Sequence, residues 1–289
     1  MANDGYGAII AKHRLASRLA AMRERTGLSL TEVNDKLGWE RVRLDRFERN
    51  EWRKPDLSAI RDLARIYGVS QGELAELEEL GAHARERGWW RSYEDVFGKG
   101  HEFPGFENDA ARISLYLPLV LPGLMQTRAY IEAVLAVGPR SPQWRERALE
   151  ARLRRQQILG RTDGTAPRVV AVITEAALLY QWGTPEDRRA QLAHLAALSA
   201  RPSIDLRLLR FADGLHPGMC CVIDIFDFPD DADPSVVYLE NDTGIQEVTK
   251  PADVHAYKQT FAQVRDSALA PAATKAYLHQ LTNTQEGPQ

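Results

Sequence analysis

Apolar positions follow the spacing of short helices through about the first eighty residues. Between the apolar runs stand glycines, which often end helices, and serine or aspartate, which often cap the next one. Two helix starts carry a full capping box, Ser29 with Glu32 and Ser70 with Glu73. The pattern predicts five helices: one that ends before Gly27, three at residues 29–37, 40–49 and 56–67, and one that begins at Ser70.

Beyond about residue 105 the pattern changes to alternating or continuous apolar runs of strand length, separated by helical segments. This mixture is typical of a mixed α/β domain. Two prolines, Pro251 and Pro271, are each expected to begin a closing helix. Strands are expected at residues 112–117, 168–173, 204–209, 220–228 and 236–239.

The change of pattern divides the chain, and a length of 289 residues fits two domains. We expect a multidomain protein with an N-terminal all-α five-helix bundle and a C-terminal mixed α/β domain. The predicted boundaries are an all-α domain at 1–80, a linker rich in glycine and aromatic residues at 81–105, the α/β domain at 106–282 and a disordered tail at 283–289.

Composition places the chain among ordinary globular proteins, with 44% hydrophobic and 27% charged residues. No apolar run is long enough to cross a bilayer, and the first ten residues lack the pattern of a secretory signal. The two cysteines, Cys220 and Cys221, are adjacent, which argues against a disulfide framework or a cysteine-rich zinc site. We therefore expect the protein to work in the reducing cytoplasm, without a metal or other cofactor.

Charge is distributed unevenly along the chain. Residues 1–67 carry a net charge of +4 and the remaining residues −7, which gives −3 for the whole. A basic N-terminal part followed by an acidic remainder indicates that a polyanion, if the protein binds one, is bound by the N-terminal part.

The helix expected at residues 40–49 carries much of this positive charge. Two helices joined at Gly38, the second with outward arginines, are the arrangement that enters the major groove of DNA. Arginine suits this role because its planar fork pairs with guanine edges and with phosphates. From spacing alone, a solvated basic face on a helical bundle fits about as well. The basic side chains in question are Arg41, Arg43, Arg46 and Arg49, followed in the loop by Arg53 and Lys54.

Residues 14–68 resemble the helix-turn-helix domain of Cro and phage repressors, the XRE family, which implies a lambda-repressor-like fold and DNA binding. The resemblance is carried by Leu19, Arg23, Gly27, Leu28, Ser29, Val33, Leu37, Gly38, Leu44, Phe47, Glu48, Arg49, Asn50, Pro55, Leu63, Ala64, Tyr67 and Gly68.

The family's functional positions transfer to this sequence residue by residue. The resemblance assigns a structural ion pair to Arg23 and Glu48. It assigns base contacts to Arg41, Val42 and Arg46. It assigns phosphate contacts to Ser29, Arg43, Arg49, Arg53 and Lys54.

Two positions depart from the family pattern and bear on which operator is read. Leu30 stands where a glutamine that touches DNA usually begins the second helix, so one polar anchor is missing. Glu40 stands where serine or threonine usually caps the recognition helix.

Residues 88–281 resemble the C-terminal domain of actinobacterial WhiJ-like regulators. Such proteins are transcription factors of development or antibiotic production. They are often encoded beside a small BldB-like partner and are described as antitoxin-like. The matching segments are 88–90, 110–113, 121–127, 152–156, 174–178, 201–202, 216–218 and 237–240, together with the helix around Tyr257.

Other polar residues do not form a catalytic or metal-binding pattern, and we expect no enzyme. Glu175 and Glu240 each follow an apolar strand, where a helix cap or a surface ion pair is commoner than acid–base catalysis. His216 lies in a turn-forming stretch with no second metal ligand nearby. The self-cleavage of phage-type repressors needs a scissile Ala-Gly bond, and the sequence contains no such dipeptide. The basic residues at 145–155 are expected to pair with the acidic stretch at 224–233 or to face water.

These features together predict a dimeric, sequence-specific transcriptional regulator in the cytoplasm, associated with the nucleoid. It is expected to bind a palindromic double-stranded DNA operator, while the second domain dimerises and senses an effector or a partner. The identity of a small-molecule effector stays open. The alternative is an antitoxin-like protein that sequesters a small BldB-like partner and autoregulates its own operon.

Overall fold

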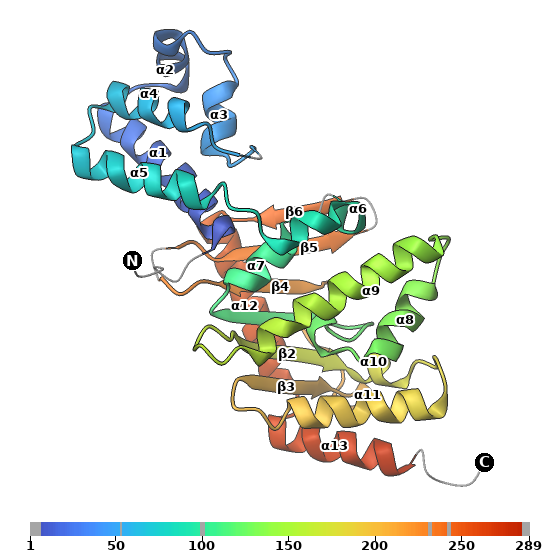
Figure 1. The fold of residues 1–289 in the computed structure, drawn as a ribbon. Coiled ribbons are helices and arrows are strands. Elements are labelled where there is room, and N and C mark those ends of the chain that lie inside the picture. The colour runs from blue at the N-terminus through green and yellow to red at the C-terminus, as the bar shows by residue number, and fades with distance from the viewer. Residues whose placement is uncertain (1–6, 53, 99–101, 231–232, 242–243, 285–289) are drawn as a thin grey trace. The chain divides into compact units, whose positions relative to one another are not determined.

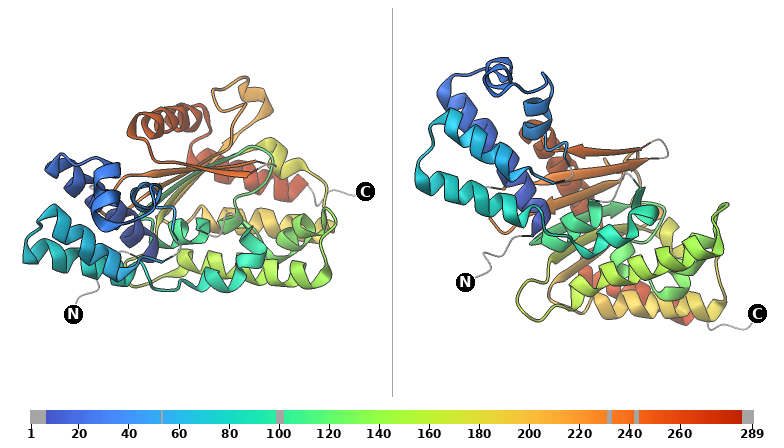
Figure 2. Two further views of the ribbon diagram at one scale, coloured as in Figure 1. Left: turned by 90° about the horizontal axis from the view of Figure 1, so that it is seen from above. Right: turned by 45° about the horizontal axis from the view of Figure 1, so that its top comes forward.

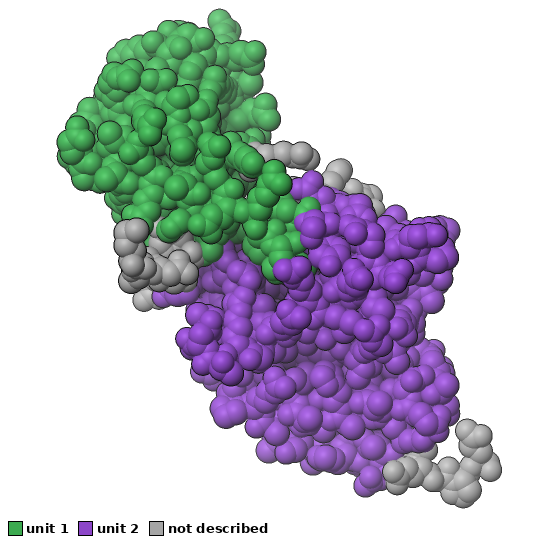
Figure 3. Space-filling model, in the orientation of Figure 1, with its two compact units in different colours: residues 1–91 green, residues 92–289 purple. Residues whose placement is uncertain are grey.

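The computed structural model describes residues 7–52, 54–98, 102–230, 233–241 and 244–284. The chain forms two compact units, residues 1–91 and 92–289 (Figure 3). Each unit contains a hydrophobic core of its own. A helical N-terminal region followed by a mixed α/β domain is therefore confirmed.

The first unit is a bundle of helices (Figure 1). Its core buries apolar side chains from every helix, among them Leu19, Val33, Leu44, Leu63 and Leu77. Burial of these stripes stabilises helices that are too short to be stable alone. The helices are α1 (Ala8–Thr26), α2 (Leu30–Leu37), α3 (Arg43–Glu48), α4 (Leu57–Tyr67) and α5 (Gln71–His83).

Capping residues set the helix ends. The Ser29 hydroxyl accepts from the Glu32 amide at 3.2 Å, and the Glu32 carboxylate accepts from the Ser29 amide at 2.8 Å. Ser70 and Glu73 form the same box at the start of α5. The glycines that end α1, α2 and α4 all have positive φ, a conformation that costs glycine little. These capping boxes confirm the starts expected from the sequence.

The expected linker at residues 81–105 contains regular structure. It includes the end of α5, the 3₁₀ turn η1 (Trp89–Tyr93), α6 (Glu94–Phe97) and the first turn of α7 (Phe103–Asp109). Residues 99–101 lie outside the described part of the chain.

The second unit is built on a six-stranded sheet with the order β3-β2-β1-β4-β5-β6. The three strands on one side, β1 to β3, are parallel, whereas β4, β5 and β6 pair antiparallel. The strands are β1 (Arg112–Leu117), β2 (Arg168–Thr174), β3 (Ile204–Leu209), β4 (Ile223–Asp227), β5 (Val236–Asn241) and β6 (Gly244–Val248).

Helices cover both faces of this sheet (Figure 2). On one face α12 (Pro251–Ser267) packs against Tyr116, Val172, Ile225 and Val237. The other face is covered by α7, α8 (Arg128–Ala136), α9 (Pro142–Gln156) and α11 (Pro185–Leu198). Helix α13 (Pro271–Thr284) lies beside β3 and α11. The short helix α10 (Glu175–Leu179) follows β2 directly.

Four sequence expectations for this unit need correction. The strand expected at 220–228 begins only at Ile223, because residues 216–220 form turns. The edge strand β6 was not expected, since its residues show no clear alternation. Two arginines of the basic helix at 145–155 find other partners than the acidic stretch: Arg155 binds Glu107 and Arg147 binds Asp95. Of the expected tail, residues 283 and 284 belong to α13, and 285–289 lie outside the described residues.

Candidate nucleic-acid interface

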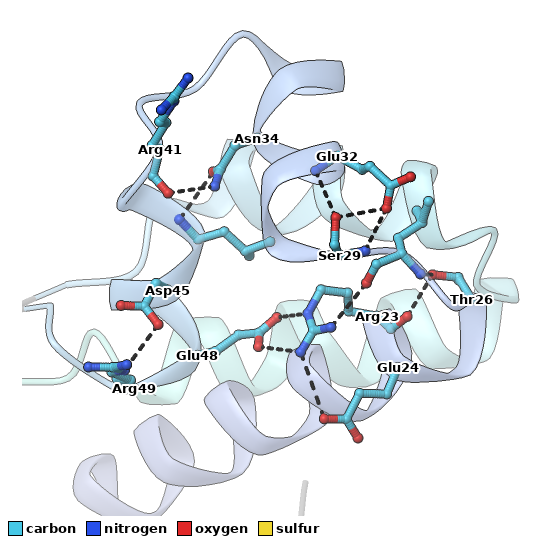
Figure 4. Close-up of polar contacts among 12 residues, drawn as sticks. Arg23, Glu24, Thr26, Ser29, Glu32, Asn34, Arg41, Asp45, Glu48 and Arg49 are labelled. Carbon is cyan, nitrogen blue, oxygen red and sulfur yellow. Dashed lines mark hydrogen bonds and ion pairs between the residues drawn. The ribbon is translucent and has the colours of Figure 1, made fainter.

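Arg23 of α1 and Glu48 of α3 form a two-pronged ion pair (Figure 4). Nε of Arg23 donates to Oε1 of Glu48 at 2.7 Å, and Nη2 donates to Oε2 at 2.9 Å. Nη1 donates to the carbonyl of Leu28 at 3.0 Å, so the same side chain also holds the segment just before the N-cap of α2. The hydrogen bonds that Arg23 donates to Glu48 raise the pKa of Arg23. The pair therefore fixes α3 relative to the rest of the bundle.

A buried carboxamide organises the turn between α2 and α3. Nδ2 of Asn34 donates to the carbonyl of Arg41 at 2.9 Å, and Oδ1 accepts from the amide of Leu44 at 3.3 Å. Gly38 ends α2 with φ of 63°. Asn34 thus replaces a side-chain cap at the start of α3, where Val42 offers none. Sequence reasoning missed Asn34; the signal was a lone asparagine among the apolar positions of a short helix.

The expected recognition helix is shorter than its sequence pattern suggested. It was predicted over residues 40–49, whereas α3 spans Arg43–Glu48. Glu40 does not cap it, because the helix begins after Val42 and Asn34 satisfies the amide of Leu44. Arg41 and Val42 consequently lie in the turn before α3, and Arg46 lies on the helix itself.

The three residues assigned to base contacts are all exposed. Val42 is 56% exposed, which is unusual for a branched apolar side chain. Within the described part of the chain, the guanidinium groups of Arg41 and Arg46 form no ion pair. The side chain of Arg41 points away from the other labelled residues in Figure 4. The turn therefore offers Arg41 and the methyl groups of Val42, and α3 offers Arg46, with neither arginine in an ion pair among the described residues.

The residues assigned to phosphate contacts have different surroundings. Arg43 pairs with Asp56 at 3.3 Å and lies over the Trp39 ring, 4.2 Å from its centroid. Arg49 pairs with Asp45 at 3.0 Å. Both pairs are largely exposed, so a phosphate can compete with these carboxylates at small cost.

The remaining phosphate candidates are Ser29, Lys54 and Arg53. Ser29 is exposed, but its hydroxyl is engaged in the capping box with Glu32. Lys54 is exposed and forms no ion pair among the described residues. Arg53 lies outside the described part of the chain.

The end of α3 is held by aromatic packing and a special backbone conformation. Asn50 has φ of 62°, and the amide of Glu51 donates back to the carbonyl of Arg46 at 2.8 Å. The indole of Trp52 donates to the carbonyl of Phe47 at 3.1 Å and packs on its ring. Phe47 and Trp52 form part of the wall of a groove of about 270 Å³. Arg46 and the acidic Glu40 and Glu51 also line this groove.

Neither metal nor membrane features accompany this surface. Among the described residues, no three histidine, cysteine, aspartate or glutamate side chains are arranged to hold a metal ion. None of the described helices combines the length and the apolar composition needed to cross a bilayer.

Comparison with known proteins separates the same two parts of the chain. Residues 14–77 match a family described as a helix-turn-helix domain, which indicates a DNA-binding regulator. No curated protein and no solved structure matches the chain. Residues 101–280 match a family described as a domain of unknown function, DUF5753. Because this second match spans more than half of the chain, the protein belongs to the DUF5753 family and joins that domain to an N-terminal helix-turn-helix domain.

Proposed function

We propose that this protein is a sequence-specific transcriptional regulator of the Cro and phage-repressor (XRE) type with a WhiJ-like second domain. The observation that carries the proposal is the exposure of Arg41 in the turn before α3 and of Arg46 on α3, neither of them in an ion pair among the described residues, in a helix-turn-helix domain. Recognition helices present their N-terminal residues to base edges in the major groove.

Each exposed group has a chemical counterpart on DNA. The forked guanidinium groups of Arg41 and Arg46 match O6 and N7 of guanine, and the methyl groups of Val42 match the thymine methyl. Arg43, Arg49, Arg53, Lys54 and Ser29 would contact the flanking phosphates and fix the register. Because Arg43 and Arg49 are already positioned by Asp56 and Asp45, they lose less side-chain entropy on binding.

The second domain would supply dimerisation and effector sensing, and the protein would act in the cytoplasm on nucleoid DNA. A two-fold dimer places two recognition helices in successive major grooves, which requires a palindromic operator. We propose no catalytic role. Glu175, one candidate acid, accepts hydrogen bonds from the Phe211 amide and the Tyr277 hydroxyl, which supports a structural function.

Selection of bound DNA from a random library by the full-length protein tests this proposal. The expected product is one palindromic sequence with half-sites about 10 base pairs apart, centre to centre. The matched control is the double variant Arg41→Ala, Arg46→Ala, which should enrich no sequence. Failure of the wild-type protein to enrich any sequence would contradict the proposal.

A further inference from the structure

The second unit contains a cavity of about 380 Å³, the size of known small-molecule sites. One wall is the sheet face opposite α12, and α8 and α9 contribute another. Much of the lining is apolar, including Leu117, Val120, Leu135 and Trp144. Such a lining favours an organic ligand with an apolar body.

A buried carboxyl group lies on the sheet wall of this cavity. Asp224 of β4 stands in register with Leu115 of β1 and Tyr238 of β5, on the face that the cavity adjoins. The residue is only 9% exposed, and its Oδ1 has no hydrogen-bond partner among the described residues. A buried carboxyl oxygen without a partner carries an unrecovered desolvation cost, and a ligand that donates a hydrogen bond to it recovers this cost.

The charges around Asp224 favour a positive ligand. Glu107 of α7 and Arg155 of α9 satisfy one another through two hydrogen bonds of 2.7 Å. Glu240 lies two residues beyond Tyr238 on β5, on the same sheet face as Asp224, and also lines the cavity. Burial and the neighbouring Glu107 raise the pKa of Asp224 to about 8, with Arg155 opposing and Glu240 adding to the shift. The raised pKa favours the protonated carboxyl group, and a nearby cation would favour its ionisation.

Arg152 on α9 is the competing feature of the cavity. Its Nη1 donates to Oε1 of Gln126 at 3.5 Å, and it has no ion pair among the described residues. Burial and the nearby Arg155 lower its pKa to about 10, with Glu240 and Tyr130 opposing the shift. An anionic ligand would bind at Arg152, so the binding of a cationic ligand and of an anionic ligand must be compared directly.

We propose that this cavity binds a small organic amine, with its ammonium group between Asp224 and Glu240 and its apolar body against Leu117, Leu135 and Trp144. The inference rests on the proposed function in that the amine would be the effector of the regulator. Binding of the amine itself does not depend on DNA binding. The ammonium group supplies the donors that Asp224 lacks, and the apolar wall excludes the water that would otherwise screen the charge.

Calorimetric titration of the full-length protein with three probes of one shape tests the proposal. The probes are 2-phenylethylamine, 2-phenylethanol and phenylacetate, which are cationic, neutral and anionic. The amine is expected to bind at least tenfold more tightly than the other two. Repetition at pH 7 in buffers of different ionisation enthalpy should show that binding releases protons, because Asp224 gives up its proton to face the ammonium group.

Variants locate the site. Asp224→Asn should weaken amine binding at least tenfold and abolish the proton release, and Glu240→Gln should weaken it less. The matched control is Asp227→Asn on the same strand. Asp227 pairs with Lys258 of α12, on the opposite face of the sheet, so its loss should leave amine affinity unchanged. Thermal melting of each variant verifies folding.

Each contrary result has a definite meaning. Preferential binding of phenylacetate would overturn the proposal in favour of an anion site at Arg152. Equal binding of the alcohol and the amine, or binding of none, would overturn it as well. A wild-type protein that binds the amine but selects no DNA would refute the proposed function and leave the amine site intact.

Discussion

Arg23 and Glu48 are 25 residues apart in sequence and join α1 to the last residue of α3 through two hydrogen bonds. Their side chains are only 15% and 11% exposed, so water competes weakly for them. The pair therefore acts as a scaffold contact behind the proposed DNA-reading surface.

Replacement of Glu48 by Gln should lower the free energy of unfolding by about 2–3 kcal/mol, because it leaves a shielded guanidinium with only the exposed carboxylate of Glu24, 3.7 Å away, as its counter-charge. The control is Asp45→Asn, which breaks the exposed pair between Asp45 and Arg49. That change should cost less than about 1 kcal/mol. Urea unfolding followed by tryptophan fluorescence measures both, and equal costs would contradict the scaffold role.

Asn34→Ala should destabilise the first unit by about 1–3 kcal/mol, since it leaves the amide of Leu44 and the carbonyl of Arg41 without their partner. The turn before α3 should also exchange its amide hydrogens faster. Hydrogen exchange of the Leu44 amide is the direct measurement. Exchange as slow as in the wild type would show that the carboxamide does not hold this turn.

Helix starts in the first unit could be predicted because the signals are local. Ser29, Ser70 and Asp56 cap their helices through atoms two or three residues away. The start of α3 could not, because it depends on Asn34, which lies in the preceding helix and makes contacts seven and ten residues away. The ion pair between Arg23 and Glu48 was predicted from the family resemblance, not from any spacing rule.

The cavity of the second unit could not be predicted from the sequence, for a different reason. Around β4, Ile223 and Ile225 alternate with Asp224, which is typical of a strand with one face in water. Helices cover both faces, so Asp224 is buried although its sequence neighbourhood indicates exposure. Burial of this kind depends on how α7, α8 and α9 pack, and periodicity carries no information about it.

Lys54→Ala should weaken binding to all DNA sequences alike and lower the slope of log affinity against log salt by about one, as expected for one lost phosphate contact. The control is Arg65→Ala on α4, which removes the same charge from a side chain paired with Asp62. Fluorescence anisotropy between low and physiological salt measures the slope. An unchanged slope for Lys54→Ala would refute the assignment.

Dimerisation is expected to depend on the second unit. Residues 1–91 contain a complete core, and side chains such as Leu15, Leu44 and Leu77 are already buried within it. A fragment of these residues should therefore fold as a monomer and bind the operator orders of magnitude more weakly than the dimer, because it contacts one half-site. Sedimentation of both proteins is the test. A monomeric full-length chain, or a fragment that dimerises and binds equally tightly, would disprove this expectation.

The central claim is that Arg41 and Arg46 read bases. The most direct measurement compares the affinity of wild type, Arg41→Ala, Arg46→Ala and the control Arg65→Ala for the selected operator and for random DNA at one salt concentration. Loss of a bidentate guanine contact should cost about 1–3 kcal/mol on the operator and much less on random DNA, while the control changes neither appreciably. Equal losses on operator and random DNA would contradict the claim, because they would show that these arginines contact only the phosphate backbone.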